Sequence, residues 1–282
     1  MFPMYENCKL CGNNKFILLH KTSKYNYVKC SCCGVFSVNP LPKIPDQFYN
    51  DYEFNKTFIE LFDEYKLLYK NSLIGKLRRI EGLLNKALKV KQMRFLDIGC
   101  GGGEYVYAAK ELGLEAHGID VDEKSCIFAK SLGLNIKNTD LINANYPENF
   151  FDVIQAKQVL EHIPEPKEFL LEVQRILKKD GVLMLDVPNQ EGLIQKLKII
   201  LNLKSEEYGF LQPMRHIFAY NKESLNFILK KIGLKIIFCQ TSWPGDPVDY
   251  PLYKQKVIQK IMFKFAASIN MGSVLVVYAQ KK

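Results

Sequence analysis

Short apolar runs and amphipathic runs alternate along the chain from residue 93 onward. The apolar runs have the length of buried strands and cover residues 93–98, 114–119, 135–137, 151–156, 182–187, 234–240 and 273–279. In the runs between them, apolar residues recur at three- and four-residue steps, which predicts helices over residues 103–112, 123–132, 166–178 and 222–232. This alternation predicts an α/β fold in which helices cover both faces of a mainly parallel sheet.

The chain before residue 93 follows a different pattern. Apolar runs at residues 16–19 and 25–28 predict a β-hairpin, and residues 47–91 have a helical period. Three prolines between Asn39 and Pro45 block regular structure and mark a linker. We therefore expect three parts, namely a small module and linker over residues 1–45, a helical connecting segment over 46–91 and the α/β domain over 92–282.

Five of the eight cysteines lie within the first 33 residues. Cys8 and Cys11 form a C-x2-C-G knuckle, and Cys30 and Cys33 form a second one. Two thiolates separated by two residues can coordinate the same tetrahedral ion, and the glycine after each pair can adopt the backbone conformation that the tight turn requires. We expect these four cysteines to bind a structural Zn²⁺ ion; an iron–sulfur centre and unligated buried thiols are the alternatives. Cys30 and Cys32 form an alternative C-x-C ligand pair, but the repetition of the C-x-x-C-G pattern favours Cys33 as the ligand.

Composition and charge narrow the class of protein. With 48% hydrophobic and 24% charged residues, the 282-residue chain is not a disordered, collagen-like or disulfide-scaffold protein. The net charge of +9 suits nucleic acid, an anionic membrane surface or a phosphorylated substrate. Because no Lys/Arg run exceeds two residues, we attribute the charge mainly to overall composition and do not expect nucleic acid to be the partner. We expect a cytoplasmic protein with no transmembrane segment, because no apolar run approaches the about 18 residues of a spanning helix and no signal peptide is visible.

Glycines follow the first strand of the α/β domain. Asp97 stands two residues before Gly99, and the run continues Gly-Cys-Gly-Gly-Gly to Gly103. Such a strand-to-helix turn presents backbone amides to a ligand at close range. A dinucleotide pattern would have a glycine where Glu104 stands, so the run points away from NAD and toward another nucleoside ligand. Asp120 ends the second strand, where a carboxylate can accept both hydroxyls of a ribose.

The glycine turn, the strand end Gly118-Ile119-Asp120 and the segments 158–164 and 177–181 together resemble the class I S-adenosylmethionine-dependent methyltransferases. The resemblance covers about residues 90–282. The cysteine module and proline linker resemble a narrower group, the bacterial zinc-ribbon methyltransferases that act on sugars or related polysaccharide precursors. The resemblance implies a Rossmann-like sheet of seven strands in the order 3-2-1-4-5-7-6, with the last strand antiparallel, and S-adenosylmethionine (SAM) as cofactor.

The resemblance also implies which residues would contact SAM. Gly99, Gly101 and Gly102 would cradle the methionine end of the cofactor, which Asp97 would orient. Asp120 would hold the ribose. The remaining contacts would come from Val121 on the adenine face, Asp140 and Leu141 beside the adenine ring, and Lys157 and Gln158 near the methionine amino group and the sulfonium. For Asp140, capping a turn is the alternative.

Methyl transfer to a hydroxyl, or to a carbon beside a carbonyl, needs a base. Glu161 and His162 follow the fourth strand at the carboxyl edge of the sheet, where open α/β folds bind ligands. We expect His162 to be the base, with Glu161 beside it and His216 as a second candidate; a structural or cofactor-side role is the alternative for His162. Arg215 would contact a phosphate of the acceptor or form a surface ion pair. We expect His117 to be structural.

The predicted acceptor is a small molecule, namely a sugar, nucleotide sugar or other surface-polysaccharide precursor that can carry a phosphate. Three segments would form its pocket, around Tyr49–Tyr52, 192–215 and 242–272, with the loop Trp243–Pro247 as a cover. The alternatives are an RNA substrate, held by the zinc module and the basic surface, and a quinone or lipid hydroxyl. The intact glycine turn and Asp120 argue against a non-catalytic binding module.

Overall fold

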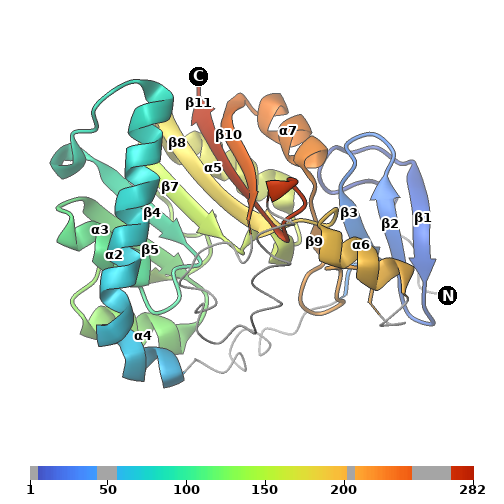
Figure 1. Cartoon of the computed structure of the whole chain (residues 1–282), viewed down its shortest axis with the longest axis horizontal. Coiled ribbons are helices and arrows are strands. Elements are labelled where there is room, and N and C mark those ends of the chain that lie inside the picture. Colours follow the sequence, from blue (N-terminus) through green and yellow to red (C-terminus); the bar gives the residue numbers. More distant parts are fainter. Residues whose placement is uncertain (1–5, 43–55, 202–206, 243–267) are drawn as a thin grey trace. The chain divides into compact units, whose positions relative to one another are not determined.

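The computed structural model describes residues 6–42, 56–201, 207–242 and 268–282 (Figure 1). The chain divides into two compact units, each built from separate stretches of sequence. The first unit comprises residues 1–44, 158–171 and 185–278, and the second comprises residues 45–157, 172–184 and 279–282. The N-terminal cysteine module therefore belongs to the same unit as the segment that carries Glu161 and His162.

A seven-stranded sheet has the order β10-β11-β8-β7-β4-β5-β6. Its strands are β4 (Arg94–Ile98), β5 (Glu115–Asp120), β6 (Ile136–Asn138), β7 (Phe151–Lys157), β8 (Leu177–Pro188), β10 (Leu234–Ser242) and β11 (Val274–Lys281). β4 pairs in parallel with β5 and β7, and β5 pairs in parallel with β6. The predicted order 3-2-1-4-5-7-6 is confirmed, and it places β4 between β5 and β7, so that their carboxyl ends meet at one edge.

The helices connect the strands largely where the sequence predicts them. They are α2 (Lys56–Leu84), α3 (Glu104–Glu111), α4 (Glu123–Ser131), α5 (Pro166–Ile176), α6 (Leu193–Ile200) and α7 (Lys222–Lys231), with the 3-10 turns η1 (Val90–Gln92) and η2 (Leu160–His162). Asp122 caps α4 by accepting a hydrogen bond from the Ser125 amide at 3.0 Å, and Asn221 and Ser224 form a capping box on α7. Among the described helices, none is long and apolar enough to cross a membrane.

The second unit packs α3, α4 and β6 closely around β5. One core cluster joins Cys100, Val106, Cys126, Ala129, Leu134 and Ile136. Gly118 of β5 leaves the room for it, because a β-carbon at this position would lie 2.6 Å from Ile136 Cδ1 and 2.8 Å from Cys100 Sγ. This close approach fixes the loop that follows β4 against the end of β5.

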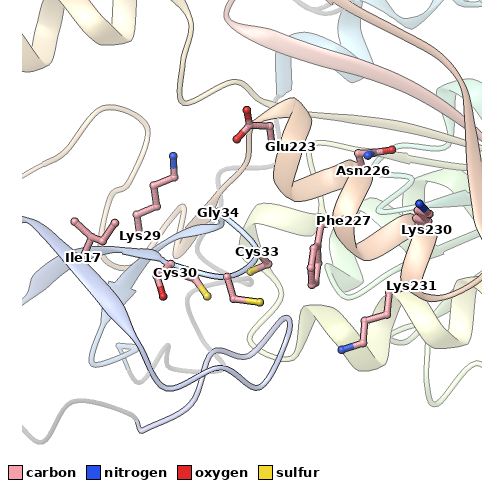
Figure 2. Close-up of a pocket in the computed structure, with 12 residues that line it drawn as sticks. Ile17, Lys29, Cys30, Cys33, Gly34, Glu223, Asn226, Phe227, Lys230 and Lys231 are labelled. Carbon is pink, nitrogen blue, oxygen red and sulfur yellow. The ribbon is translucent and has the colours of Figure 1, made fainter.

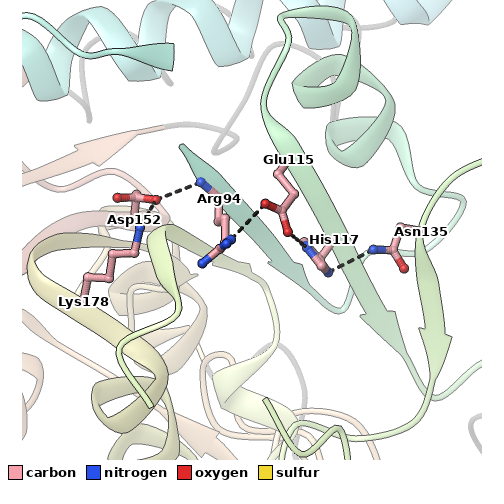
Figure 3. A network of polar contacts seen from close by, with 6 residues as sticks. All are labelled: Arg94, Glu115, His117, Asn135, Asp152 and Lys178. Carbon is pink, nitrogen blue, oxygen red and sulfur yellow. Dashed lines mark hydrogen bonds and ion pairs between the residues drawn. The ribbon is translucent and has the colours of Figure 1, made fainter. Parts of the chain in front are cut away.

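A polar network ties together the amino ends of the strands in the second unit (Figure 3). The Arg94 guanidinium donates to Glu115 at 2.8 Å, and the Arg94 amide donates to the Asp152 carboxylate at 2.8 Å. Glu115 also lies 3.1 Å from His117 Nε2, and the other ring nitrogen lies 3.0 Å from the Asn135 side chain. Both nitrogens of His117 are therefore engaged, one with Glu115 on the same strand and the other with Asn135 just before β6, which agrees with a structural role.

The first unit contains a four-stranded sheet in the order β1-β2-β3-β9. β1 (Phe16–Lys21) and β2 (Asn26–Cys30) form the predicted hairpin, and β3 (Phe36–Asn39) pairs antiparallel with β2. β9 (Phe218–Ala219) pairs with β3, so a late segment of the chain completes the sheet of the cysteine module. The core of this sheet contains Tyr27, Phe36, Val38, Leu211 and Ala219.

Some features differ from the sequence predictions or fall outside the described residues. β8 begins at Leu177, where the sequence predicts the end of a helix and a turn. Asp180 keeps a turn-like φ of 63° but lies within the strand. The sequence does not predict β9 or α6. β9 has only two residues, too few to show an alternation of apolar and polar positions, and α6 lies in a stretch without a clear helical or strand pattern. The Tyr49–Tyr52 segment and the Trp243–Pro247 loop lie outside the described residues.

Candidate functional site

The loop between β4 and α3 is built on left-handed glycines. Gly99, Gly101 and Gly103 have φ values of 68°, 51° and 84°, which residues with a side chain rarely adopt. The amides of Gly99 and Cys100 both donate to the Ile119 carbonyl, at 2.9 and 3.0 Å, and tie the loop to β5. The loop therefore leads directly into the amino end of α3, where amides are open to a ligand.

Asp120, at the end of β5, holds this loop in place. Its Oδ2 accepts a hydrogen bond from the Gly101 amide at 2.7 Å, and its Oδ1 accepts one from the Asp122 amide at 2.9 Å. Burial raises the pKa of Asp120, while these amide hydrogen bonds oppose the rise. Each carboxylate oxygen has a second lone pair, so Asp120 can hold the loop and still accept hydroxyls of a ligand.

Asp97 is buried and belongs to a polar chain that the sequence does not predict. Its register partner on β7 is Gln155, whose Nε2 donates to Asp97 Oδ1 at 2.9 Å. Lys76 of α2 donates in turn to Gln155 Oε1 at 2.8 Å. Burial raises the pKa of Asp97 to about 7, against the hydrogen bond from Gln155 and the charges of Lys76 and Lys157. A cationic ligand would therefore favour ionisation of this carboxyl.

Glu104, the first residue of α3, adds another carboxyl beside the loop. Its Oε2 would lie 3.8 Å from a β-carbon on Gly101. Burial raises the pKa of Glu104 to about 8, and the charges of Asp97 and Asp120 contribute to the rise. The sequence singles out Glu104 only because it replaces a glycine of the dinucleotide pattern. The structure places it with Asp97 and Asp120 in one group, called the acidic cluster below.

The other predicted cofactor residues lie in mixed surroundings. Val121 is 44% exposed, whereas Gly102 and Leu141 are buried. Asp140 caps a local turn, because its Oδ1 accepts a hydrogen bond from the Asn143 amide at 2.9 Å. This is the role that the sequence left open as an alternative. An adenine contact of Asp140, Val121 or Leu141 stays a prediction.

Two predicted residues follow one another at the end of β7. The Lys157 ammonium lies 5.4 Å from the centroid of the Tyr105 ring, and its charge lowers the pKa of both Asp97 and Glu104. Gln158 has a left-handed φ of 55°. The chain therefore turns sharply directly after the strand, before it enters η2.

In the first unit, the structure brings together the three predicted catalytic residues. Glu161, His162 and His216 each have a ligating atom within 4.8 Å of those of the other two, and the two imidazole centroids lie 4.9 Å apart. The Ile217 amide donates to the Glu161 carbonyl at 3.0 Å, which joins η2 to the segment that carries His216. These residues are called the Glu-His-His cluster below.

Backbone carbonyls orient both imidazoles of this cluster. His162 Nδ1 lies 2.7 Å from the Arg215 carbonyl oxygen, and His216 Nδ1 lies 3.2 Å from the Phe210 carbonyl oxygen. Because a carbonyl oxygen can only accept, Nδ1 of each ring carries the hydrogen and Nε2 keeps its lone pair. Burial lowers the pKa of His162, and it lowers that of His216 to about 4 with a contribution from the His162 charge. Both rings are therefore neutral at pH 7.

Glu161 is the buried member of the cluster. It is 0% exposed, and neither of its carboxylate oxygens has a hydrogen-bond partner among the described residues. Burial raises the pKa of Glu161 to about 8, and the charge of Asp186 contributes. A buried carboxyl without a partner is unfavourable in its charged form, so Glu161 is mainly protonated at pH 7 unless a cation is present.

The four predicted zinc ligands converge in the first unit. The Sγ atoms of Cys8, Cys11, Cys30 and Cys33 all lie within 4.8 Å of one another, with 3.7 Å between Cys8 and Cys33 and 3.6 Å between Cys11 and Cys30. A tetrahedron with Zn–S bonds of about 2.3 Å has edges of about 3.8 Å, which fits these separations. Cys32 is exposed and is not one of the four.

The two knuckles share one local geometry. The Gly12 amide donates to the Cys8 carbonyl at 2.8 Å, and the Gly34 amide donates to the Cys30 carbonyl at 3.0 Å. Both glycines are left-handed, with φ values of 81° and 74°, as the predicted turns require. A hydrogen bond with Cys33 lowers the pKa of Cys8 to about 5. The same contact raises the pKa of Cys33, and burial raises that of Cys11 to about 12. Without a metal the cluster therefore favours one thiolate, on Cys8, and a bound cation would favour the others.

A cavity of about 920 Å³ lies beside the second knuckle (Figure 2). Residues 29–34 line it from one side and α7 from the other, with the Phe227 ring between them. Its lining residues include the basic Lys29, Lys230 and Lys231 and the acidic Glu223. The lining is therefore net positive and suits an anionic group.

Comparisons with known proteins agree with this fold. The chain is 29% identical over 153 residues to a ubiquinone biosynthesis O-methyltransferase of Glaesserella parasuis, a match that covers 50% of the chain and 59% of the relative. The chain thus spans about three fifths of that relative's length. A SAM-dependent methyltransferase of Archaeoglobus fulgidus has a TM-score of 0.52 at 20% identity, covering 79% of this chain and 100% of its own.

A second solved structure, a putative SAM-dependent methyltransferase of Listeria monocytogenes, has a TM-score of 0.53 at 16% identity and covers 76% of this chain and 99% of its own. These structural similarities show a shared fold. The family described as a methyltransferase domain matches residues 73–237, which include the glycine loop, Asp120 and the Glu161-His162 segment. Because this match covers more than half of the 282 residues, the chain belongs to the methyltransferase-domain family.

Proposed function

We propose that the protein transfers a methyl group from SAM to a small-molecule acceptor. The acidic cluster around the glycine loop carries this proposal, within a chain of the methyltransferase-domain family. SAM has a positively charged amino group and a sulfonium, which Asp97, Glu104 and Asp120 complement. The pyrophosphate of a dinucleotide would instead face three carboxyls, which would oppose its binding.

The residues that would hold SAM come from the glycine loop and from the ends of the neighbouring strands. The amides of Gly99, Gly101 and Gly102 would contact the methionine end, Asp97 would receive its amino group, and Asp120 would accept the ribose hydroxyls. Val121, Asp140 and Leu141 would border the adenine, with Lys157 and Gln158 nearer the sulfonium. When bound, SAM supplies both the methyl group and the leaving group, so the protein has to position the acceptor and take its proton.

We propose His162 as the base for that proton and His216 as the second candidate. The free lone pair on Nε2 of each ring supports this role. If His162 is the base, His162→Ala should lower turnover by about 10²–10⁴ and leave the affinity for SAM nearly intact. A loss of SAM affinity with unchanged turnover at saturation would instead place His162 on the cofactor side.

For the acceptor, we propose a sugar, nucleotide sugar or related polysaccharide precursor. The resemblance of the cysteine module to that of sugar methyltransferases supports this class, and the cavity beside Lys29, Lys230 and Lys231 suits a phosphate on such a molecule. A second candidate is an aromatic hydroxyl of a quinone precursor. The name of the Glaesserella parasuis relative favours this candidate.

Transfer of label from methyl-radiolabelled SAM tests the proposal and separates the acceptor classes. Parallel reactions would contain nucleotide sugars, catechol-type quinone precursors and total RNA. We expect labelled nucleotide sugar. Label confined to the catechols would select the second candidate, and label confined to RNA would contradict a small-molecule acceptor.

We also propose that Cys8, Cys11, Cys30 and Cys33 bind one structural Zn²⁺ ion. The sulfur separations of 3.6 and 3.7 Å support four-thiolate coordination. Such an ion would hold the two knuckles together in a module whose sheet is small.

A further inference from the structure

We propose that Glu161, His162 and His216 form a second metal site, which binds a divalent first-row transition-metal ion such as Zn²⁺. One carboxylate and two imidazoles are a donor set that such ions use in proteins. This Glu-His-His site shares no ligand with the four-cysteine cluster. Whether it binds a metal can be tested without measuring methyl transfer.

The spacing of the donors suits an ion between them. Metal bonds to imidazole nitrogen and carboxylate oxygen are about 2.1 Å long, so two ligands of one ion lie about 3–4 Å apart. One donor atom from each of Glu161, His162 and His216 lies within 4.8 Å of the others. Small rotations of these side chains are therefore enough to close the three donors around an ion.

The histidines are already prepared as ligands. A metal-binding histidine usually donates its other ring N–H to a carbonyl or carboxylate, which fixes the tautomer and aims the free nitrogen. His162 makes this contact with the Arg215 carbonyl oxygen at 2.7 Å, and His216 makes it with the Phe210 carbonyl oxygen at 3.2 Å. Two separate backbone segments thus orient the two rings in the same way.

Glu161 supplies the independent observation that points to a ligand. Its side chain is fully buried, and both carboxylate oxygens lack a hydrogen-bond partner among the described residues. A Glu–His pair that works by direct hydrogen bonding would bring oxygen and nitrogen to about 2.6–3.2 Å. No such bond satisfies Glu161, although both imidazoles are close. A cation would satisfy the carboxylate that the fold leaves without a partner.

The surrounding charges also allow a cation. Asp186 is buried, at 4% exposure, and its charge acts on Glu161, so it adds negative potential. The charge of Arg215 acts on both histidines in the opposite sense, but its side chain is exposed and screened by water. His162 and His216 are only partly buried, which leaves room for a further ligand from solvent or substrate. In a role that rests on the proposed function, the ion would coordinate an oxygen of the acceptor and lower the pKa of its hydroxyl. A histidine whose Nε2 binds the ion is a ligand, so His162 would act as the base only in the absence of the ion.

Metal counting on the full chain tests the site. Purified protein and variants would be dialysed to equilibrium against buffer with micromolar Zn²⁺, and zinc per chain would be measured by elemental analysis. We expect Glu161→Gln and His216→Ala each to hold about one zinc fewer per chain than the wild type. His20→Gln is the matched control, because it removes an imidazole away from the cluster and should leave the count unchanged. Equal counts in the wild type, Glu161→Gln and His216→Ala would overturn the proposal.

A second measurement uses the wild type alone and does not depend on how the variants fold. Wild type stripped of metal and reloaded with one equivalent of Zn²⁺, which the four thiolates should take up first, would then receive Co²⁺. The Co²⁺ should produce visible d–d bands without the intense near-ultraviolet bands of cobalt–thiolate bonds. Absence of the d–d bands, or bands with thiolate character only, would contradict a nitrogen–oxygen site. SAM binding measured on the same samples separates the two proposals, because it should persist whether or not the second ion binds.

Discussion

Replacement of Asp120 by asparagine tests the assignment of the cofactor loop most sharply. In the structure each carboxylate oxygen of Asp120 already accepts one backbone amide, from Gly101 at 2.7 Å and from Asp122 at 2.9 Å. Asparagine keeps one oxygen but turns the other into an NH₂ group, which cannot accept from an amide or from a ribose hydroxyl. The variant therefore loses at least one charged hydrogen bond to the ligand and one anchor of the loop.

The size of the effect follows from the bonds that are lost. A hydrogen bond to a charged group contributes about 1.5–3 kcal/mol, which corresponds to a weakening of SAM affinity by about 10–150-fold. Isothermal titration of SAM into the wild type and Asp120→Asn measures this ratio directly. Far-ultraviolet circular dichroism at the titration temperature checks that the variant is folded.

Asp122→Ala is the matched control. Asp122 lies two residues away and carries the same charge, but its side chain caps α4 through the Ser125 amide. Its removal should lower the free energy of unfolding by about 0.5–2 kcal/mol and change SAM affinity less than twofold. The reasoning is refuted if Asp120→Asn is folded and binds SAM as the wild type does, or if Asp122→Ala loses affinity to the same extent.

Further predictions address the core, the metal and the acidic cluster. Gly118→Ala should lower the free energy of unfolding in urea by about 1–3 kcal/mol, because its methyl group would meet Ile136 and Cys100 at 2.6 and 2.8 Å; Gly75→Ala, on an open face of α2, should instead raise it by about 1 kcal/mol. Cys8→Ser should lower zinc content by about one equivalent and reduce Tm, whereas Cys32→Ser should change neither; full zinc content in Cys8→Ser would contradict the cysteine site. The affinity for SAM should fall at least about tenfold between pH 8 and pH 6, because burial raises the pKa of Asp97 to about 7 and the cationic amino group binds the ionised form. Titrations of Asp97→Asn should show a shallower profile, in which Glu104, with a pKa of about 8, accounts for the remaining dependence.

Local signals in the sequence predict much of the fold and the cofactor loop. The glycine run after the first strand and Asp120 at the end of the second are short-range features, since the strand pattern alone places them at the same edge of a parallel sheet. The two cysteine knuckles are equally local, because each requires only a C-x-x-C-G turn. The family resemblance predicts the order of the strands, and the structure confirms it.

Features that depend on contacts between segments far apart in the sequence cannot be predicted from such local signals. The two hydrogen bonds that link Lys76 to Gln155 and Gln155 to Asp97 depend on the position of α2 and on the register of β4 against β7. No single stretch of sequence therefore predicts them. β9 consists of two residues and exists only because β3 offers an edge. The sequence predicts His162 and His216 separately, each from its own chemistry, and only the fold of the first unit shows that they share a cluster with Glu161.

Titration of the wild type with SAM tests the central claim, which is that the glycine loop and the acidic cluster form a SAM site. The account predicts one SAM bound per chain, displacement by S-adenosylhomocysteine, and no competition from NAD. Saturation with SAM at one site that Gly101→Val abolishes in a folded protein would support the claim, because the valine would fill the space at the left-handed turn. Absence of SAM binding by the folded wild type, or binding that Gly101→Val leaves unchanged, would contradict it.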